Sequence, residues 1–397
     1  MALNDALNNE LDDQDLNKQK KPYASIGLDG GEIYTGVLDT PISEDWSPIL
    51  RSFGLDPEVF EVVGDQVKMS KWQQSKRTES GDRDIVWLYA YKAVFRRKLG
   101  PTVSPEDVQN LRKVVQNWKF AKPVKKETTE PATTFVVNWA DWQLFKSAGG
   151  GVDATIERVL ESFDKTVQRF KELQRAGRNI EQIALVNMGD PIEGCTGHYP
   201  SQEFSVQGTQ RQQLLLALDL WSLGVRTLAS LAPKAIFIST LSNHGEWQRR
   251  NGKNFTTDSD SADGFLADTL KRIFEGTDHI NDWVIPHDEM CIQKELSGVP
   301  VAFTHGHKVS GKEIEWLRGQ SIKLLRDYGK EPKLWVTAHK HHVKVDDMGM
   351  WWRFQCPSLD GGSKWFEDIA GMWSTPGTLT FLVGLHDKNH WSDMSVL

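Results

Sequence analysis

The stretch Ile183-Ala-Leu-Val-Asn-Met-Gly-Asp190 decides the fold, because a short apolar run ends there at a glycine and an aspartate. Four other stretches have the same apolar character, at residues 134–138, 235–240, 299–304 and 333–338. Runs of this length are typical of strands that are buried on both faces of a sheet. Residues 350–356 and 378–383 predict further strands, which could form a second sheet.

The segment between the first two strands has the period of an amphipathic helix. Its apolar side chains recur every three or four positions, at Ile156, Val159, Leu160, Phe163, Val167, Phe170 and Leu173. We expect Asp153 to cap the N-terminus of this helix and Gly177 to follow its end. Strands alternating with helices predict an α/β body with a largely buried sheet.

Length and composition exclude several classes of protein. The chain has 397 residues, 39% of them hydrophobic and 25% charged, which is a globular composition sufficient for about two domains. Three cysteines are too few for a disulfide framework, and the N-terminus has no signal-peptide pattern. No stretch approaches the roughly 20 apolar residues of a membrane span. We therefore expect a cytoplasmic protein that has no membrane partner.

Breaks in composition divide the chain into four parts. Residues 1–21 predict a disordered tail, and residues 22–120 predict a small α/β accessory module. Residues 121–133 are rich in Pro, Lys, Glu and Thr, as is typical of a linker. The main domain is expected at residues 134–397.

The accessory module has an uneven charge distribution. Residues 29–66 hold nine acidic side chains and one basic one, whereas residues 68–98 hold nine basic and three acidic ones. Within the basic part, alternation places four aromatic side chains on one face of a strand: Trp87, Tyr89, Tyr91 and Phe95. These aromatics can form the core of the module, which is the favoured interpretation, or part of a surface that stacks on nucleic-acid bases.

Residue types that bind metals follow each of the five predicted strands. The strands run in turn into Asp141-Trp-Gln143, Gly189-Asp190, Ser242-Asn-His-Gly-Glu246, His305-Gly-His307 and His339-Lys-His341. Loops at the carboxyl ends of strands in an open α/β sheet converge on one edge, where ligands bind. Each motif alone could be a turn or a helix cap, but five in order predict one site.

The donor types indicate the chemistry of this site. Carboxylate, imidazole and amide donors suit first-row divalent ions, and the absence of thiolates argues against a purely structural site. There are enough ligands for two ions, which together can clamp both oxygens of an in-line phosphoryl displacement. The residues therefore predict a dinuclear phosphoesterase, with Mn²⁺ as the expected ion and iron, Zn²⁺ or Mg²⁺ as alternatives.

The ordered set of motifs resembles the calcineurin-like metallophosphoesterase superfamily over about 250 residues. The family's D-x-H, G-D, G-N-H-E/D, H and G-H-x-H pattern is similar to the five motifs quoted above. The resemblance implies a calcineurin-like two-sheet sandwich flanked by helices (αββα), preceded by the small α/β module. The ligands it implies are Asp141, Gln143 and His341 for one ion, Asn243, His305 and His339 for the other, and Asp190 bridging both.

The same resemblance implies roles at the phosphate. A hydroxide that bridges the ions would attack in line, and His244 would contact the scissile phosphate and assist the leaving oxygen. Gln143 departs from the family, which usually has His there, so that ion is expected to be held more weakly or to be a harder ion. Three further residues are candidates for the substrate site. His198 lies in a Gly-rich loop that could reach the substrate, and Glu193 could orient a ligand. Trp365 could stack on a base.

The phrase Gly189-Asp-Pro-Ile-Glu-Gly194 followed by Tyr199-Pro-Ser-Gln202 resembles phage-encoded members described as DNA repair exonucleases, related to the bacterial SbcD nuclease. This resemblance implies a DNA substrate, a location in the host cytoplasm, and either a homo-oligomer or an ATPase partner subunit. Two alternatives remain open at this stage. One is a phosphatase acting on phosphomonoesters, cyclic nucleotides or phosphoproteins, which the net charge of −7 favours. The other is a non-catalytic scaffold that keeps the fold.

Overall fold

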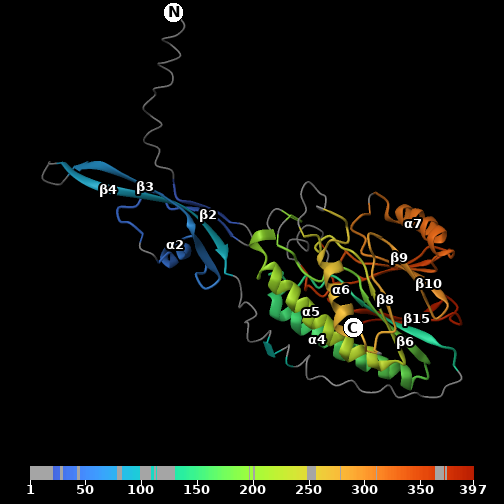
Figure 1. Ribbon diagram of the computed structural model, residues 1–397. Helices are drawn as coiled ribbons and strands as arrows, with labels where there is room; N and C mark the ends of the chain where they lie inside the picture. Colours follow the sequence, from blue (N-terminus) through green and yellow to red (C-terminus); the bar gives the residue numbers. More distant parts are fainter. Residues whose placement is uncertain are drawn as a thin grey trace, which may run out of the picture. The chain divides into compact units, whose positions relative to one another are not determined.

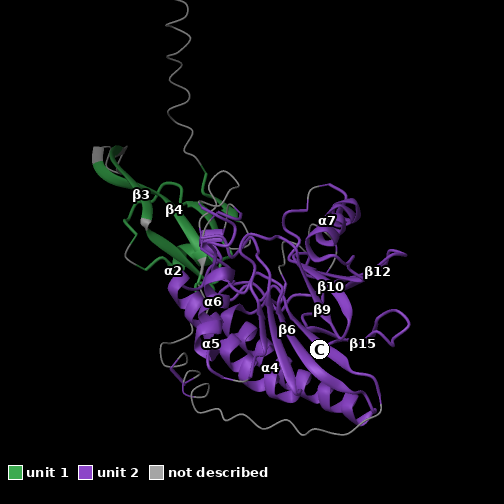
Figure 2. Cartoon of the chain, turned by 45° about the vertical axis from the view of Figure 1, so that its right-hand side comes forward, with its two compact units in different colours: residues 1–99 green, residues 100–397 purple. Residues whose placement is uncertain are grey.

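The computed structural model describes residues 21–26, 30–42, 45–77, 83–98, 109–110, 113, 130–195, 197–199, 202–247, 256–277, 279–309, 311–362, 371 and 373–397. The chain forms two compact units, residues 1–99 and residues 100–397 (Figure 2). The expected tail lies outside the described residues except for its last position, and most of the expected linker lies outside them as well.

The larger unit contains two sheets. The six-stranded sheet has the order β15-β14-β5-β6-β7-β8, and its strands are β5 (Thr133–Trp139), β6 (Ile180–Asn187), β7 (Lys234–Ser239), β8 (Asp282–Val284), β14 (Leu379–Val383) and β15 (Trp391–Val396). The five-stranded sheet has the order β12-β13-β11-β10-β9, and its strands are β9 (Ile292–Leu296), β10 (Val299–Thr304), β11 (Leu334–Thr337), β12 (Lys344–Asp347) and β13 (Trp352–Gln355).

The strands that carry the predicted ligands are parallel to their neighbours. Strand β6 pairs in parallel with both β5 and β7, and β10 pairs in parallel with β11. Antiparallel strands lie at the outer positions, where β14 pairs with β5 and β9 pairs with β10. The carboxyl ends of β5, β6 and β7 therefore point the same way in one sheet, and those of β10 and β11 point the same way in the other. The site prediction from sequence places all five at the edge of a single sheet, so it is right about parallel strand ends and wrong about the number of sheets.

Alternation along each strand builds a sandwich of four layers. In β5, Phe135 and Val137 belong to the core beneath the helices, whereas Val136 belongs to the core between the two sheets. In β11, Val336 faces the same inter-sheet core and Trp335 packs in the core beneath a helix on the far side. The predicted αββα architecture is thus present, because side chains with period 2 bury both faces of each sheet.

Helices cover the outer faces of both sheets (Figure 1). The six-stranded sheet is covered by α4 (Gly151–Arg175), α5 (Gln210–Leu228) and α6 (Ala262–Phe274), and the five-stranded sheet by α7 (Glu313–Tyr328). Two short 3-10 helices, η1 (Gln202–Phe204) and η2 (Ala229–Leu231), flank α5. The predicted helix is α4, but Gly150 and not Asp153 is its N-cap. Asp153 lies in the first turn, where a carboxylate is favourable to the helix dipole.

Contrary to the expectation from sequence, one stretch among the described helices is long and apolar enough to cross a membrane by length and composition. It spans Gln210–Leu231, has a mean hydropathy of 1.5, and is 56% buried inside the structure. Its Leu216, Leu220 and Trp221 pack in the core beneath the helices. Core helices commonly pass this test, so the finding is weak evidence for a membrane span.

The smaller unit has one antiparallel sheet with the order β1-β2-β4-β3. Its elements are β1 (Tyr23–Ile26), β2 (Gly30–Tyr34), α2 (Ser47–Ser52), β3 (Phe60–Arg77) and β4 (Arg83–Arg97). The predicted aromatic face of β4 divides along the strand. Tyr91 and Phe95 are buried near the part of β4 that pairs with both β2 and β3. Trp87 is 44% exposed, because it lies farther along β4, where only β3 pairs with it and the two strands form a two-stranded ribbon.

Candidate metal centre

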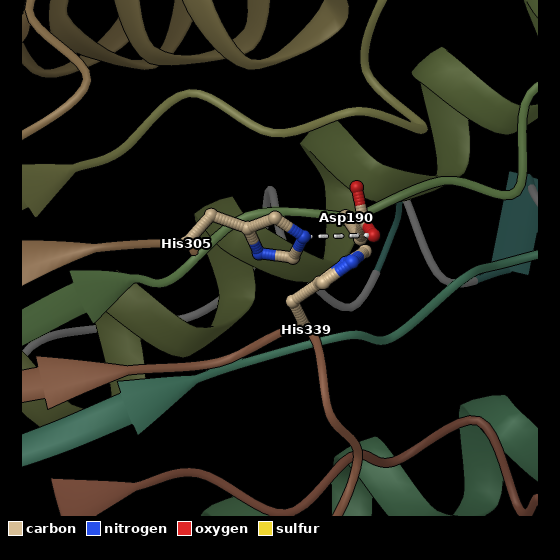
Figure 3. Close-up of side chains that lie close together, drawn as sticks. All are labelled: Asp190, His305 and His339. Atoms are coloured by element: carbon tan, nitrogen blue, oxygen red, sulfur yellow. Dashed lines mark ion pairs between the residues drawn. The ribbon is translucent and has the colours of Figure 1, made fainter. Parts of the chain in front are cut away.

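Three of the predicted ligands come together at the strand ends of the two sheets. Asp190 follows β6, His305 follows β10, and His339 follows β11, and their side chains converge as Figure 3 shows. Each offers one ligand atom, and these atoms all lie within 4.8 Å of one another. In the part of the chain that the structure describes, this is the one group of three His, Cys, Asp or Glu residues with such spacing.

His305 is the most firmly oriented member of this group. Its Nδ1 lies 2.8 Å from the backbone oxygen of Met188, while its Nε2 lies 3.1 Å from Asp190 Oδ2 and 3.1 Å from Asn243 Oδ1. A backbone contact at one ring nitrogen directs the other toward a metal ion, which is the usual support for a ligating histidine. Asn243 thereby joins the group as a fourth oxygen or nitrogen donor.

Because the group is buried, its side chains shift one another's pKa values. Burial alone would favour the protonated form of Asp190, but the imidazoles of His305 and His244 outweigh it and hold the pKa of Asp190 well below its usual range. Burial would lower the pKa of His305, yet the Asp190 carboxylate raises it to about 9. Burial and the neighbouring His305 lower the pKa of His339 to about 4, so His339 is neutral and able to ligate at pH 7.

Backbone strain is concentrated on the predicted ligands. Five of them have a left-handed backbone conformation, with φ of 49° at Asp141, 40° at Gln143, 52° at Asp190, 71° at His339 and 57° at His341. This conformation costs a non-glycine residue about 1–2 kcal/mol. Strain of this kind persists where the surrounding structure fixes it, and it clusters at functional sites.

Cross-connections between the loops hold these strained positions. The Asp141 N–H donates to the Gly189 backbone oxygen at 3.0 Å, and the His339 N–H donates to Asp141 Oδ2 at 3.2 Å. The Asp190 N–H donates to Ser242 Oγ at 2.9 Å, and Ser242 in turn is bonded to buried Asp263. The site is therefore assembled by bonds between loops that are distant in sequence.

The other predicted ligands, Asp141, Gln143 and His341, lie in a different environment. His341 Nε2 is 3.2 Å from Asp141 Oδ1, and its Nδ1 is 3.3 Å from Asp360 Oδ2. Burial would lower the pKa of His341, but these two carboxylates raise it to about 10. Gln143 Oε1 accepts a hydrogen bond from Lys146 Nζ at 2.7 Å.

Sequence reasoning missed two residues of this part of the site. Lys146 Nζ lies 2.5 Å from Asp360 Oδ2, and its side chain is only 13% exposed. Asp360 follows β13, so a search for acids after further strands could have found it, whereas no pattern distinguishes Lys146. Burial would lower the pKa of Lys146, but the carboxylates of Asp360 and Glu193 raise it, so Lys146 keeps its charge.

His244 lies beside the first group and is held by its neighbours. Its backbone N–H donates to Asp190 Oδ1 at 2.8 Å, and its ring Nδ1 lies 2.7 Å from the backbone oxygen of Glu193. The ring of His198 stacks on it at 4.6 Å between centroids, with an interplanar angle of 15°. Tyr199 donates from its hydroxyl to buried Glu193 Oε1 at 2.5 Å, which fixes the carboxylate behind His244. Direct contact of His198 or Glu193 with substrate stays a prediction, and Trp365 lies outside the described residues.

The residues present fit a divalent metal ion. Asp141 Oδ1 and Asp190 Oδ2 are buried and lack a well-aligned hydrogen-bond donor in the described part of the chain. Each of these oxygens instead faces an imidazole nitrogen, at 3.1 Å from His305 Nε2 and 3.2 Å from His341 Nε2, so a carboxylate and an imidazole could share an ion at either place. Oxygen and imidazole donors without thiolate suit Mn²⁺, iron or Zn²⁺.

Comparisons with known proteins find similarity at the level of solved structures. Neither a known protein family nor a curated protein sequence matches the chain. A novel archaeal phosphodiesterase is 12% identical with a TM-score of 0.32, and the match covers 67% of this chain and 99% of that one. Zinc-complexed Vps29 from Entamoeba histolytica is 10% identical with a TM-score of 0.28, covering 64% of this chain and 87% of that one. A hypothetical protein from Pyrococcus horikoshii OT3 is 9% identical with a TM-score of 0.31, covering 66% and 87%.

Proposed function

We propose that this chain is a metal-dependent hydrolase of phosphate esters. The observation that carries the proposal is the convergence of ligand atoms of Asp190, His305 and His339 within 4.8 Å of one another. The αββα layers place this group where strand-end loops converge, which is where α/β sheets bind ligands. His244 lies against the same aspartate, so a bound metal ion and a proton donor would act at one point.

The residues of the chain have separable tasks in this reaction. Asp190, Asn243, His305 and His339 would hold the ion, which when bound supplies a Lewis acid and an activated water near neutral pH. His244 keeps its Nδ1 on the Glu193 backbone oxygen, so its Nε2 is left to contact the phosphate. In its protonated form, His244 can therefore donate from Nε2 to the leaving oxygen.

DNA is the substrate that we propose, in keeping with the resemblance to repair exonucleases. The support is the ribbon of β3 and β4 in the smaller unit, where Lys71 lies opposite Tyr89. Lys71 Nζ lies 4.2 Å from the ring centroid of Trp87 and 5.6 Å from that of Tyr89. Trp87 is exposed and Tyr89 is half-buried. Aromatic rings next to an ammonium group suit single-stranded nucleic acid, because a base stacks on a ring while a phosphate contacts the charge. The net charge of −7 favours a smaller phosphoester instead.

The test uses protein loaded with Mn²⁺ and four substrates: labelled single-stranded DNA, labelled duplex DNA, para-nitrophenyl phosphate and its bis ester. Wild type is expected to cleave DNA and the bis ester. Asp190→Asn should lower kcat/KM by more than the roughly 10- to 100-fold that loss of an outer-sphere partner costs. Asp153→Asn on α4 is the matched control and should cleave as wild type does.

The outcomes separate the reaction from its substrate. Activity on the bis ester with inert DNA would overturn the nuclease and keep the phosphoesterase. Trp87→Ala should lower DNA cleavage more than bis ester turnover, since stacking is worth about 1–3 kcal/mol per base. No turnover of any substrate, or equal turnover by Asp190→Asn, would overturn the proposed function.

A further inference from the structure

The two halves of the predicted dinuclear site differ in what they already contain. The half made by Asp190, His305 and His339 holds three ligand atoms within 4.8 Å of one another, which is the spacing of a metal site. The half made by Asp141, Gln143 and His341 holds a side-chain cation, because Lys146 reaches into it from the loop that follows β5.

Lys146 is placed by two close contacts. Its Nζ lies 2.7 Å from Gln143 Oε1 and 2.5 Å from Asp360 Oδ2, and 13% of its side chain is exposed. An ammonium has three N–H donors, so these two contacts leave one donor for a further acceptor. Asp360 is itself fixed, because its other oxygen accepts from Ser358 Oγ at 2.7 Å. The ammonium is therefore held on the ligand that would bind the second ion.

A second divalent ion at this place would compete with the ammonium. An ion bound to Gln143 Oε1 at about 2.2 Å could lie no more than about 4.9 Å from Lys146 Nζ, which is 2.7 Å from the same oxygen. Like charges this close repel strongly, and burial weakens the screening by water. The ammonium also takes one of the two lone pairs of Gln143 Oε1, which leaves one for an ion.

A counter-charge for Asp360 is already present in the chain. The Lys146 ammonium lies 2.5 Å from the buried Asp360 carboxylate. Buried charges are stable when they are paired, so this half of the site is already paired without a second ion.

We infer that the Lys146 ammonium takes the place of the second metal ion, so that the centre holds one divalent ion at Asp190, Asn243, His305 and His339. The inference rests on the proposed function for the bound ion itself. The remaining N–H donor of Lys146 would bind a phosphate oxygen of the substrate. Stabilising charge on that oxygen is the task expected of the second ion in a two-metal site. Sequence reasoning predicted two ions, because Gln143 and His341 count as ligands until their partners are seen.

The test is the metal content of the whole chain, measured by elemental analysis after equilibration with Mn²⁺ and removal of free ion. Wild type is expected to hold one Mn²⁺ per chain, with the six-line electron paramagnetic resonance spectrum of an isolated ion. Lys146→Met frees Gln143 and should hold two ions, with the spectrum of a coupled pair. Lys146→Arg keeps the charge and should hold one ion.

Lys165→Met removes an exposed lysine of α4 and is the matched control, which should also hold one ion. Two ions in wild type would overturn the inference and leave the proposed function intact. One ion in both wild type and Lys146→Met would overturn the role of Lys146. No bound ion in wild type would overturn both the inference and the proposed function. If Lys146→Met does not fold, the wild-type count still decides the number of ions.

Discussion

Gly189 precedes Asp190 at the centre of the site, and its replacement by alanine is expected to damage stability and metal binding together. Its φ is +100°, and an added Cβ would lie 2.6 Å from Ser242 Cβ and 2.7 Å from His305 Nδ1. The backbone conformation costs alanine about 1–2 kcal/mol, and overpacking of this kind costs about 1–3 kcal/mol. Gly189→Ala should therefore lower the free energy of unfolding by about 2–5 kcal/mol.

Gly177→Ala is the matched control for this substitution. Gly177 has a φ of +96°, but nothing lies within 4 Å of an added Cβ. Gly177→Ala should lower the free energy of unfolding by only the backbone strain of about 1–2 kcal/mol, measured by urea unfolding of the metal-free protein. Only Gly189→Ala should also lose affinity for Mn²⁺, because the added methyl displaces His305. Equal unfolding free energies for the two variants, with wild-type metal affinity in both, would refute this reasoning.

Three further predictions concern stability. Gly224 lies inside α5, where replacing glycine with alanine usually stabilises the fold by about 1 kcal/mol. The added methyl would, however, lie 2.8 Å from ring atoms of Trp139 in β5 and Phe163 in α4. We expect a loss of about 1–3 kcal/mol on urea unfolding, and a gain would contradict the packing. Asp190 raises the pKa of His305 from 6.5 to about 9, against the opposing effect of burial. The protonated ring therefore stabilises the folded state fully below pH 6.5, and this stabilisation is lost as pH rises through 9. The metal-free protein should lose about 3 kcal/mol across this range, and a His305→Gln variant with the same pH dependence would disprove the assignment. Tyr199→Phe should cost about 1–3 kcal/mol, because it leaves the buried Glu193 carboxylate without its hydroxyl donor, and unfolding equal to wild type would argue against that bond.

The sequence predicted the sheets well because burial leaves a strong local signal. Phe135, Val136 and Val137 are consecutive and apolar, since one face packs against helices and the other against the second sheet. The loop ligands were predicted for a related reason. Asp190 and His305 follow such runs directly, although the runs lie in different sheets. Parallel pairing aligns the strand ends within each sheet, and the packing of the two sheets on each other brings the two sets of ends together.

The sequence could not predict contacts that depend on side-chain reach. Lys146 meets Asp360 across 214 positions of the chain, and nothing in either segment indicates the other. The partial exposure of Trp87 was also hidden, because alternation defines a face but not where the core beneath it ends. The prediction that Asp153 caps α4 was wrong, because Gly150, with a left-handed backbone conformation, is the N-cap and makes the turn into the helix without a capping side chain.

We propose that water attacks phosphorus at the centre formed by Asp190, His305 and His339. This can be tested by hydrolysis of the bis ester by Mn²⁺-loaded protein in water enriched in oxygen-18, with products analysed by mass spectrometry. We expect one oxygen-18 in the phosphate product, none in the released phenol, and the loss of this product in Asp190→Asn. Oxygen-18 in the phenol, or the same labelled phosphate from Asp190→Asn, would contradict it.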